Sequence, residues 1–131
     1  MIRIEFKNEA ELLRKINRLN SQITQSARRG LREAAEEVMA KSKEFVPVDT
    51  GALRESGHVS RVKTEGNLLS VEMAYGNSST RYARRVHEWL GSNVHWSVDG
   101  TGPKYLERPY LEMLPEIPAK LLETFRSMFV R

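Results

Sequence analysis

The sequence predicts an α+β fold in which a long N-terminal amphipathic helix and a C-terminal helix pack on a small, mostly antiparallel β-sheet. Two segments, residues 9–45 and 118–129, carry apolar residues at steps of three and four, the spacing of one helix face. Between them, residues 58–64 and 68–75 read as two strands around a turn at Glu65-Gly66-Asn67. The 131 residues contain no repeats or linkers, so we expect one domain over residues 1–131.

The first element expected is a short edge strand at residues 2–6, where apolar and charged residues alternate. Asn8 then suits the cap of the long helix, because its side chain can accept a hydrogen bond from a backbone amide of the first turn. The apolar stripe of this helix consists of Leu12, Ile16, Leu19, Ile23, Ala27, Leu31, Ala34 or Ala35, Val38, Ser42 and Phe45.

A helix over residues 9–45 would be about 54 Å long at ~1.5 Å per residue, which is unusual for so small a domain. Gly30 costs about 1 kcal/mol relative to alanine inside a helix, so a break or bend there is one outcome. If the helix runs straight, part of its stripe protrudes and needs a neighbouring subunit. We expect a single long helix, with Gly30 as the place for any kink.

Residues 46–56, VPVDTGALRES, form the joint between the long helix and the hairpin. Pro47 has no N–H group and disfavours helical angles at Val46, so the long helix must end there. Asp49 or Thr50 can cap a new short helix by accepting a backbone hydrogen bond, and Leu53 would be the apolar anchor of that helix.

The second strand of the hairpin is expected to turn Leu69, Val71, Met73 and Tyr75 towards the long helix, because alternate residues share one face. The later elements expected are a turn-rich loop at residues 76–80, a short helix at 82–90, a strand at 95–98, an exposed loop at 99–103, a helix start at Arg108-Pro109 and a terminal helix at 118–129.

The charge balance, 21 Lys and Arg against 17 Asp and Glu, gives a net charge of +4 and a pI near 9.6. Basic residues have affinity for nucleic-acid phosphates, but two of the three basic groups lie on a helix whose outer face must be polar in any case. The two groups on the long helix have no interleaved aromatic residue for base stacking. Nonspecific DNA contact stays open, and sequence-specific recognition is not expected. The three groups are Arg14-Lys15-Arg18, Arg28-Arg29-Arg32 and Arg81-Arg84-Arg85.

Neither an enzyme nor a metal site is expected. His87-Glu88 begins like the helix motif of zinc proteases, but the second histidine of that motif would fall at Gly91. His58, His87 and His95 have no regular spacing, and no glycine loop suited to phosphates occurs. No cysteine is present, which excludes disulfides and thiol chemistry. No apolar run approaches the roughly 20 residues of a membrane span, and no signal peptide is expected, so we predict no catalytic, cofactor-binding or metal-binding residues and no membrane contact.

Three segments in order resemble one family of phage proteins. They are PVDTGALRES at residues 47–56, YARRVHEW at 82–89 and GPKYLERPY at 102–110. The pattern resembles the head–tail joining or tail-completion (neck) proteins of tailed phages, the gene-product-ten-like family named after phage Hong Kong 97. His87 is inserted before the acidic residue of the middle segment, and Tyr110 replaces a small residue in the last one.

The resemblance implies a structural role in virion assembly, in a ring between the head portal and the tail tube, with six-fold symmetry on the particle and monomers in free solution. Its partners would be other copies of the chain and phage connector, tail-tube or tail-terminator proteins, in the virion and, during assembly, in the host bacterial cytoplasm. A basic nucleic-acid-binding module and a small toxin-like nuclease are the alternatives.

We expect the loops at residues 76–80 and 91–103 to contact other subunits, and Arg54 to pair with Glu88. The residues expected to form the structural motif or the interface are Pro47, Asp49, Thr50, Gly51, Leu53, Arg54, Tyr82, Glu88, Tyr105, Leu106 and Pro109.

Overall fold

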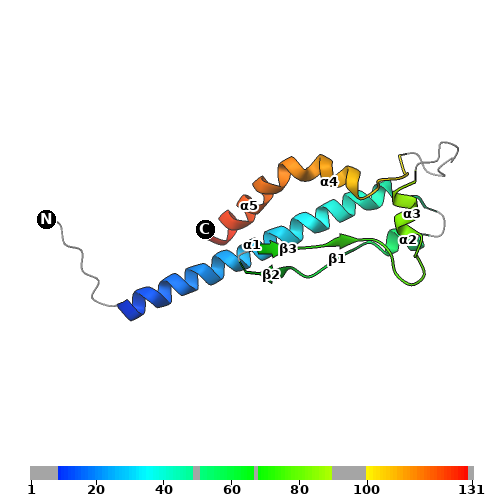
Figure 1. Ribbon diagram of the computed structural model, residues 1–131. Helices are drawn as coiled ribbons and strands as arrows, with labels where there is room; N and C mark the ends of the chain where they lie inside the picture. Colours follow the sequence, from blue (N-terminus) through cyan, green and yellow to red (C-terminus); the bar gives the residue numbers. More distant parts are fainter. Residues whose placement is uncertain (1–8, 49–50, 67, 90–99, 130–131) are drawn as a thin grey trace.

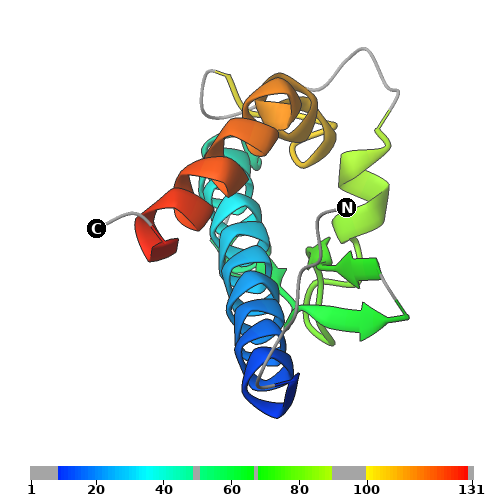
Figure 2. The same ribbon diagram turned by 90° about the vertical axis from the view of Figure 1, so that its left-hand side faces the viewer.

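The long helix is the axis of the molecule. The computed structural model describes residues 9–48, 51–66, 68–89 and 100–129. Helix α1 runs without a break through 37 residues, Glu9–Phe45. Helices α4 (Glu107–Met113) and α5 (Ile117–Phe129) lie along one side of α1 and the strands along another, as Figures 1 and 2 show. The predicted α+β class, with a long N-terminal helix, a C-terminal helix and antiparallel strand pairs, is therefore confirmed.

Gly30 lies where α5 (Ile117–Phe129) crosses α1. A Cβ atom added at Gly30 would stand 2.9 Å from Cδ2 of Leu121 and 3.4 Å from Cβ of Thr124. The glycine is buried within the unbroken helix. The missing side chain therefore serves the close approach of a second helix, and α1 is not interrupted there.

The predicted hairpin is present, but it is divided into two short ladders. Strand β1 (His58–Val59) pairs with β4 (Met73–Ala74), and β2 (Lys63–Glu65) pairs with β3 (Leu68–Ser70), both antiparallel. His58 faces Ala74 in the first ladder, whereas Lys63 faces Ser70 in the second. The outgoing chain therefore advances five residues while the returning chain covers four, which is the extra residue of a β-bulge.

Ser60 adapts the chain to this bulge. Its backbone N–H donates to the carbonyl of Glu72 at 2.8 Å, and its hydroxyl accepts from the amide of Glu72 at 2.9 Å. Because the bulge lies in the outgoing chain, the alternation of the returning chain is kept. The four residues predicted to face α1, from Leu69 to Tyr75, are all half-buried rather than fully covered.

The first helix after the hairpin is shorter than predicted, and the terminal helix begins one residue earlier than predicted. Helix α3 covers Ala83–His87 rather than residues 82–90. Helix α4 covers Glu107–Met113, and a 3₁₀ turn at Leu114–Glu116 joins it to α5. Pro115 lies in that turn and Pro118 in the first turn of α5, where proline removes no helical hydrogen bond. The strands expected at residues 2–6 and 95–98 lie outside the described residues.

The core lies at the C-terminal end of α1. Val46, Leu53, Ala83 and Tyr105 form one cluster of buried side chains, each no more than 5 % exposed. They come from the residue that follows α1, from α2 (Ala52–Glu55), from α3 and from the segment before α4. The four elements thus meet at one end of α1 (Figure 1), far from its N-terminal half.

Candidate assembly surfaces

The joint after α1 is built as the prolines and glycines of the sequence require. The helix ends at Phe45, before Pro47. Gly51 occupies the N-cap position of α2 with φ at 86°, in the left-handed region that glycine adopts without strain. Leu53, the predicted anchor, is buried in the core. Asp49 and Thr50, the predicted caps, lie outside the described residues.

Ser56 closes the joint, and the prediction of site residues missed it. Its hydroxyl donates to the carbonyl of Leu53 at 2.6 Å and accepts from the amide of Gly76 at 3.0 Å. The side chain therefore ties α2 to the segment that follows β4, in a site where Ser56 is only 7 % exposed. The signal was available, because Ser56 is the last residue of the PVDTGALRES segment.

Tyr105 is the largest side chain of the core cluster and is only 1 % exposed. Its hydroxyl donates to the carbonyl of Ala83 at 2.6 Å, and its own carbonyl accepts from the hydroxyl of Ser42 in α1 at 2.7 Å. The rings of Tyr75 and His87 meet its ring edge-to-face, with centroids 4.9 and 5.0 Å away. Burial raises the pKa of Tyr105 to about 12 and also raises the pKa of Tyr75.

Two further predicted residues, Leu106 and Pro109, lie with Tyr105. Pro109 is fully buried, and Leu106 packs against the core cluster. Tyr82, also predicted, precedes α3 and is 42 % exposed, so it belongs to the surface.

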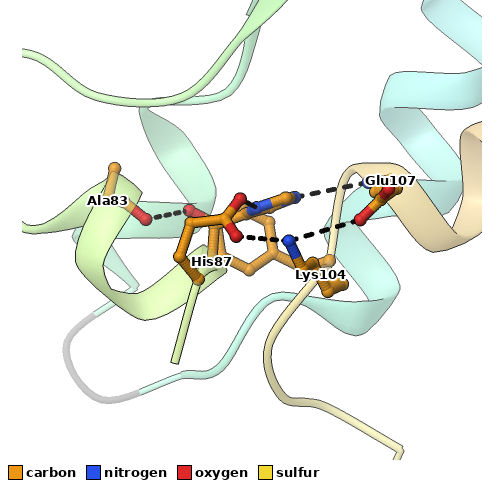
Figure 3. Close-up of polar contacts among 6 residues, drawn as sticks. Ala83, His87, Lys104 and Glu107 are labelled. Carbon is orange, nitrogen blue, oxygen red and sulfur yellow. Dashed lines mark hydrogen bonds and ion pairs between the residues drawn. The ribbon is translucent and has the colours of Figure 1, made fainter. Parts of the chain in front are cut away.

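Glu88 links α3 to α4 through a polar cluster with His87 and Lys104; Figure 3 shows how His87, Lys104 and Glu107 lie in this cluster. One carboxylate oxygen of Glu88 binds Nζ of Lys104, and the other lies 2.8 Å from Nδ1 of His87. Nε2 of His87 accepts from the amide of Glu107 at 3.4 Å. Lys104 also lies 3.5 Å from the carboxylate of Glu107. The hydrogen bond from Lys104, and then that from His87, lowers the pKa of Glu88.

The expected ion pair between Arg54 and Glu88 is not formed. Glu88 is held by Lys104 and His87, whereas the guanidinium of Arg54 has a buried Nε without a hydrogen-bond partner in the described part of the chain. Lys104 adopts a φ of 58° and donates its backbone N–H to the carbonyl of His87 at 2.8 Å. This backbone conformation brings its side chain to the cluster, which sequence spacing could not reveal.

The second basic group of α1, Arg28-Arg29-Arg32, forms hydrogen bonds and ion pairs with other residues of the same chain. Arg28 binds the carbonyl of Val62 at 3.3 Å and the hydroxyl of Thr64. Arg29 pairs with Glu33, and Arg32 with Glu36, at 2.8 and 3.0 Å. These arginines therefore fasten the hairpin and stabilise the helix surface, which weakens the alternative of a DNA-binding face at this position.

The N-terminal half of α1 leaves its apolar stripe uncovered. We call this part the α1 tip, defined by Leu13, Ile16, Leu19 and Ile23, whose exposed fractions lie between 40 and 58 %. In Figure 1 the blue end of α1 extends beyond both α5 and the strands. The first fully buried residue along α1 is Ser26 among those whose side chains are described. The protruding stripe expected of a straight helix is thus present.

An apolar groove continues the stripe between α1, α5 and the hairpin. We call it the α1–α5 groove; its volume is about 500 Å³. Leu122 and Phe125 of α5 border it and are themselves 50 and 38 % exposed. Its lining comprises Ile23, Ser26, Ala27, Leu31, Leu69, Pro118, Leu121, Leu122 and Phe125.

The described residues contain no group of three or more histidines and acids that could hold a metal ion. No helix within the described ranges is long and apolar enough to cross a bilayer.

Comparison with known proteins places the chain among phage proteins. Residues 10–96 match the family described as "Bacteriophage HK97-gp10, putative tail-component". The matched region runs from α1 through the joint and the hairpin to α3, and it ends before Tyr105, α4 and α5. No curated protein and no solved structure matches the chain significantly. Since the match covers more than half of the 131 residues, the protein belongs to the HK97 gp10-like family of phage tail components.

Proposed function

We propose that the protein is a head–tail connector or tail-completion component, which forms a ring between the head portal and the tail tube. Its membership of a family of tail components supports a structural role in the virion. The observation that carries the proposal further is the exposed apolar stripe of the α1 tip, because an uncovered stripe on a protruding helix is suited to another subunit.

The proposed partners are other copies of the chain, in a hexameric ring on the particle, and connector, tail-tube or tail-terminator proteins on either side. The protein would be in the virion and, during assembly, in the host bacterial cytoplasm. The exposed residues 77–79 and Gly100, together with residues 91–99, remain proposed as contacts with neighbouring subunits. The expectation of an exposed loop at residues 99–103 was wrong for Thr101 and Gly102, which are buried because the amide of Gly102 donates to the carbonyl of Phe45 at 3.0 Å.

Inactivating the gene in the phage that carries it tests the role. We expect electron micrographs of the lysate to show DNA-filled heads and separate tails, and a plasmid copy of the wild-type gene to restore joined particles. Joined, infectious particles in the absence of the protein would contradict the proposal.

A further inference from the structure

The apolar residues of the α1 tip are spaced for contact with another helix. Together with the half-buried Leu12, three of them, Ile16, Leu19 and Ile23, follow one another at steps of four, three and four residues. We call these four residues the tip seam. In the seven-residue repeat of paired helices, both leucines take position d and both isoleucines take position a, the two positions that pack between the helices. The partner that fits the seam is therefore a helix with the same repeat.

The face that carries the tip seam already packs against a helix further along α1. Ile16, Ile23 and Gly30 are seven residues apart and lie on one side of α1. Leu121 and Thr124 of α5 fill the space beside Gly30. Helix α5 ends at Phe129, and the blue end of α1 extends beyond it in Figure 1. The tip seam thus continues a helix-packing face, and the described part of the chain leaves it largely exposed.

A second copy supplies such a helix, and the course of α5 decides its direction. In a parallel pair, Gly30 of one α1 would face Gly30 of the other at about 8–10 Å between the helix axes. Leu121 and Thr124 occupy that space, so two parallel helices would have to diverge close to the end of the seam. In an antiparallel pair, the bodies of the two copies lie at opposite ends of the seam. The antiparallel direction therefore fits the molecule.

One antiparallel register covers the whole seam. When Leu12 of one copy lies opposite Ile23 of the other, Ile16 lies opposite Leu19. The two-fold axis repeats both contacts, so each layer of the pair consists of one leucine and one isoleucine. Leucine and isoleucine at these positions are the residues that two-stranded helix pairs use.

The residues beside the seam are compatible with this register. Leu13 then faces Asn20 of the other copy, and Lys15 faces Gln22, so like charges do not meet across the seam. A shift of seven residues towards the N-terminus of α1 would bring the two copies of Lys15 together and leave Ile23 outside the pair. The charges therefore favour the register that also buries the most apolar residues.

We propose that two copies of the chain form a two-fold dimer, in which the tip seams pack antiparallel with Leu12 of each copy opposite Ile23 of the other. Such a contact is isologous and closed, so it joins two copies and no more. The inference concerns the chain before it meets any other virion protein. It goes beyond the proposed function and does not depend on it.

Single cysteines test both the direction and the register, because the natural chain has none. Leu12→Cys and Ile23→Cys mark the two ends of the seam, and both positions lie outside the core cluster, so both variants should fold. Within one helix the two positions are about 16 Å apart at ~1.5 Å per residue, whereas a disulfide needs Cα atoms within about 7 Å. The matched control is Ala10→Cys with Gln25→Cys, because these exposed positions also lie at equal levels in the proposed pair but on the outer side of α1.

The variants are mixed in pairs at high protein concentration, oxidised and separated without reductant. We expect a linked heterodimer of Leu12→Cys with Ile23→Cys, little homodimer of either variant alone and little product from the control pair. A variant with both cysteines should stop at the linked dimer. Homodimers of the single variants, which indicate a parallel pair, would overturn the inference. So would a ladder of linked species from the double variant, equal linking by the control, or no linking.

Sedimentation equilibrium gives an independent measurement. The natural chain should show an equilibrium between monomer and dimer. Ile16→Lys should raise the dissociation constant by more than about tenfold, because it places two lysines in the seam near the two-fold axis. Asn17→Lys adds the same charge at an exposed position outside the seam and should leave the dimer in place. Equal loss of the dimer in both variants would contradict the seam.

A deletion of residues 2–8 distinguishes a second copy from the chain's own N-terminal segment. The link between Leu12→Cys and Ile23→Cys should form with and without these residues. A link that is lost with the deletion, or that appears only after it, would show that the segment takes part and would overturn the inference.

The dimer and the proposed function fail in different experiments. A natural chain that stays monomeric at high concentration contradicts the dimer and leaves the role in assembly. Joined particles in the gene-deleted phage contradict that role and leave the dimer.

Discussion

At the residue scale, Gly30 is a glycine because α5 leaves no room for a side chain there, and not because the backbone needs the conformational freedom of glycine. An alanine there gains about 1 kcal/mol of helix propensity, but its Cβ meets the end of the Leu121 side chain at 2.9 Å. We expect the two effects to offset, so that the free energy of unfolding of Gly30→Ala stays within about 1 kcal/mol of the natural value. Urea denaturation measures it.

Two control variants separate the steric overlap with α5 from the gain in helix propensity. Gly30→Leu should destabilise by about 1–3 kcal/mol, because the added atoms force α5 away from α1. Ala40→Gly, at an exposed position of the same helix, should cost about 1 kcal/mol through propensity alone. A full gain of stability in Gly30→Ala would show that α5 does not approach as closely as described.

Tyr105 allows a second test at this scale. Tyr105→Phe removes the donor to the Ala83 carbonyl and leaves a buried acceptor without its partner, which should cost about 1–3 kcal/mol in the free energy of unfolding. Tyr82→Phe, at a 42 % exposed position, should cost less than about 0.5 kcal/mol. Equal effects of the two variants in urea denaturation would contradict the assigned role.

The same tyrosine predicts a stability change at high pH. Its pKa is about 12 in the folded protein and about 10 in an unfolded chain. A raised pKa means that the contribution of Tyr105 is complete below pH 10 and is lost as the pH rises towards 12. Spectroscopic titration should therefore show a late tyrosinate step that coincides with unfolding, and that step should be smaller in Tyr105→Phe, where only Tyr75 keeps a raised pKa.

At the scale of elements, the polar cluster between α3 and α4 predicts a pH effect of the opposite sign. The pKa of Glu88 is lowered by Lys104 and His87, so its contribution is present above the unfolded pKa and is lost as the pH falls. We expect Glu88→Gln to lower the melting temperature slightly at neutral pH and less at high salt, because the pair is exposed. The difference should vanish in acid, and Glu112→Gln, which lies outside the cluster, should show no such pattern.

The elements also show which parts of the fold follow from local sequence. Periodicity predicted α1, the hairpin and α5, and Pro47 predicted the end of α1, because these signals act between near neighbours. The bulge was not predicted, since one extra residue between Ser60 and Lys63 changes the pairing without changing the composition. The partner of Glu88 was predicted wrongly, because Lys104 reaches it only through the three-dimensional course of the chain. The α1–α5 groove likewise depends on two helices that are distant in sequence.

At the scale of the whole molecule, the folded core and the surface proposed for assembly are spatially separate. The core cluster and the crossing of α5 lie beyond Ser26, whereas the described side chains before it are exposed apart from the half-buried Leu12. An isolated helical extension adds little stability, because helices gain most of theirs from packing. A chain that begins at Ile23 should therefore unfold cooperatively, with a free energy of unfolding within about 2 kcal/mol of the natural one.

The same truncation should abolish self-association, because it removes Leu13, Ile16 and Leu19 of the α1 tip. Sedimentation equilibrium and urea denaturation measure the two properties on one sample. Removal of residues 117–131 is the contrasting control: it uncovers the face of α1 around Gly30 and should destabilise the fold severely, because α5 packs along that face. A truncated chain that begins at Ile23 and no longer folds would show that the tip supports the core directly, and the separation between a stable body and an assembling arm would then be wrong.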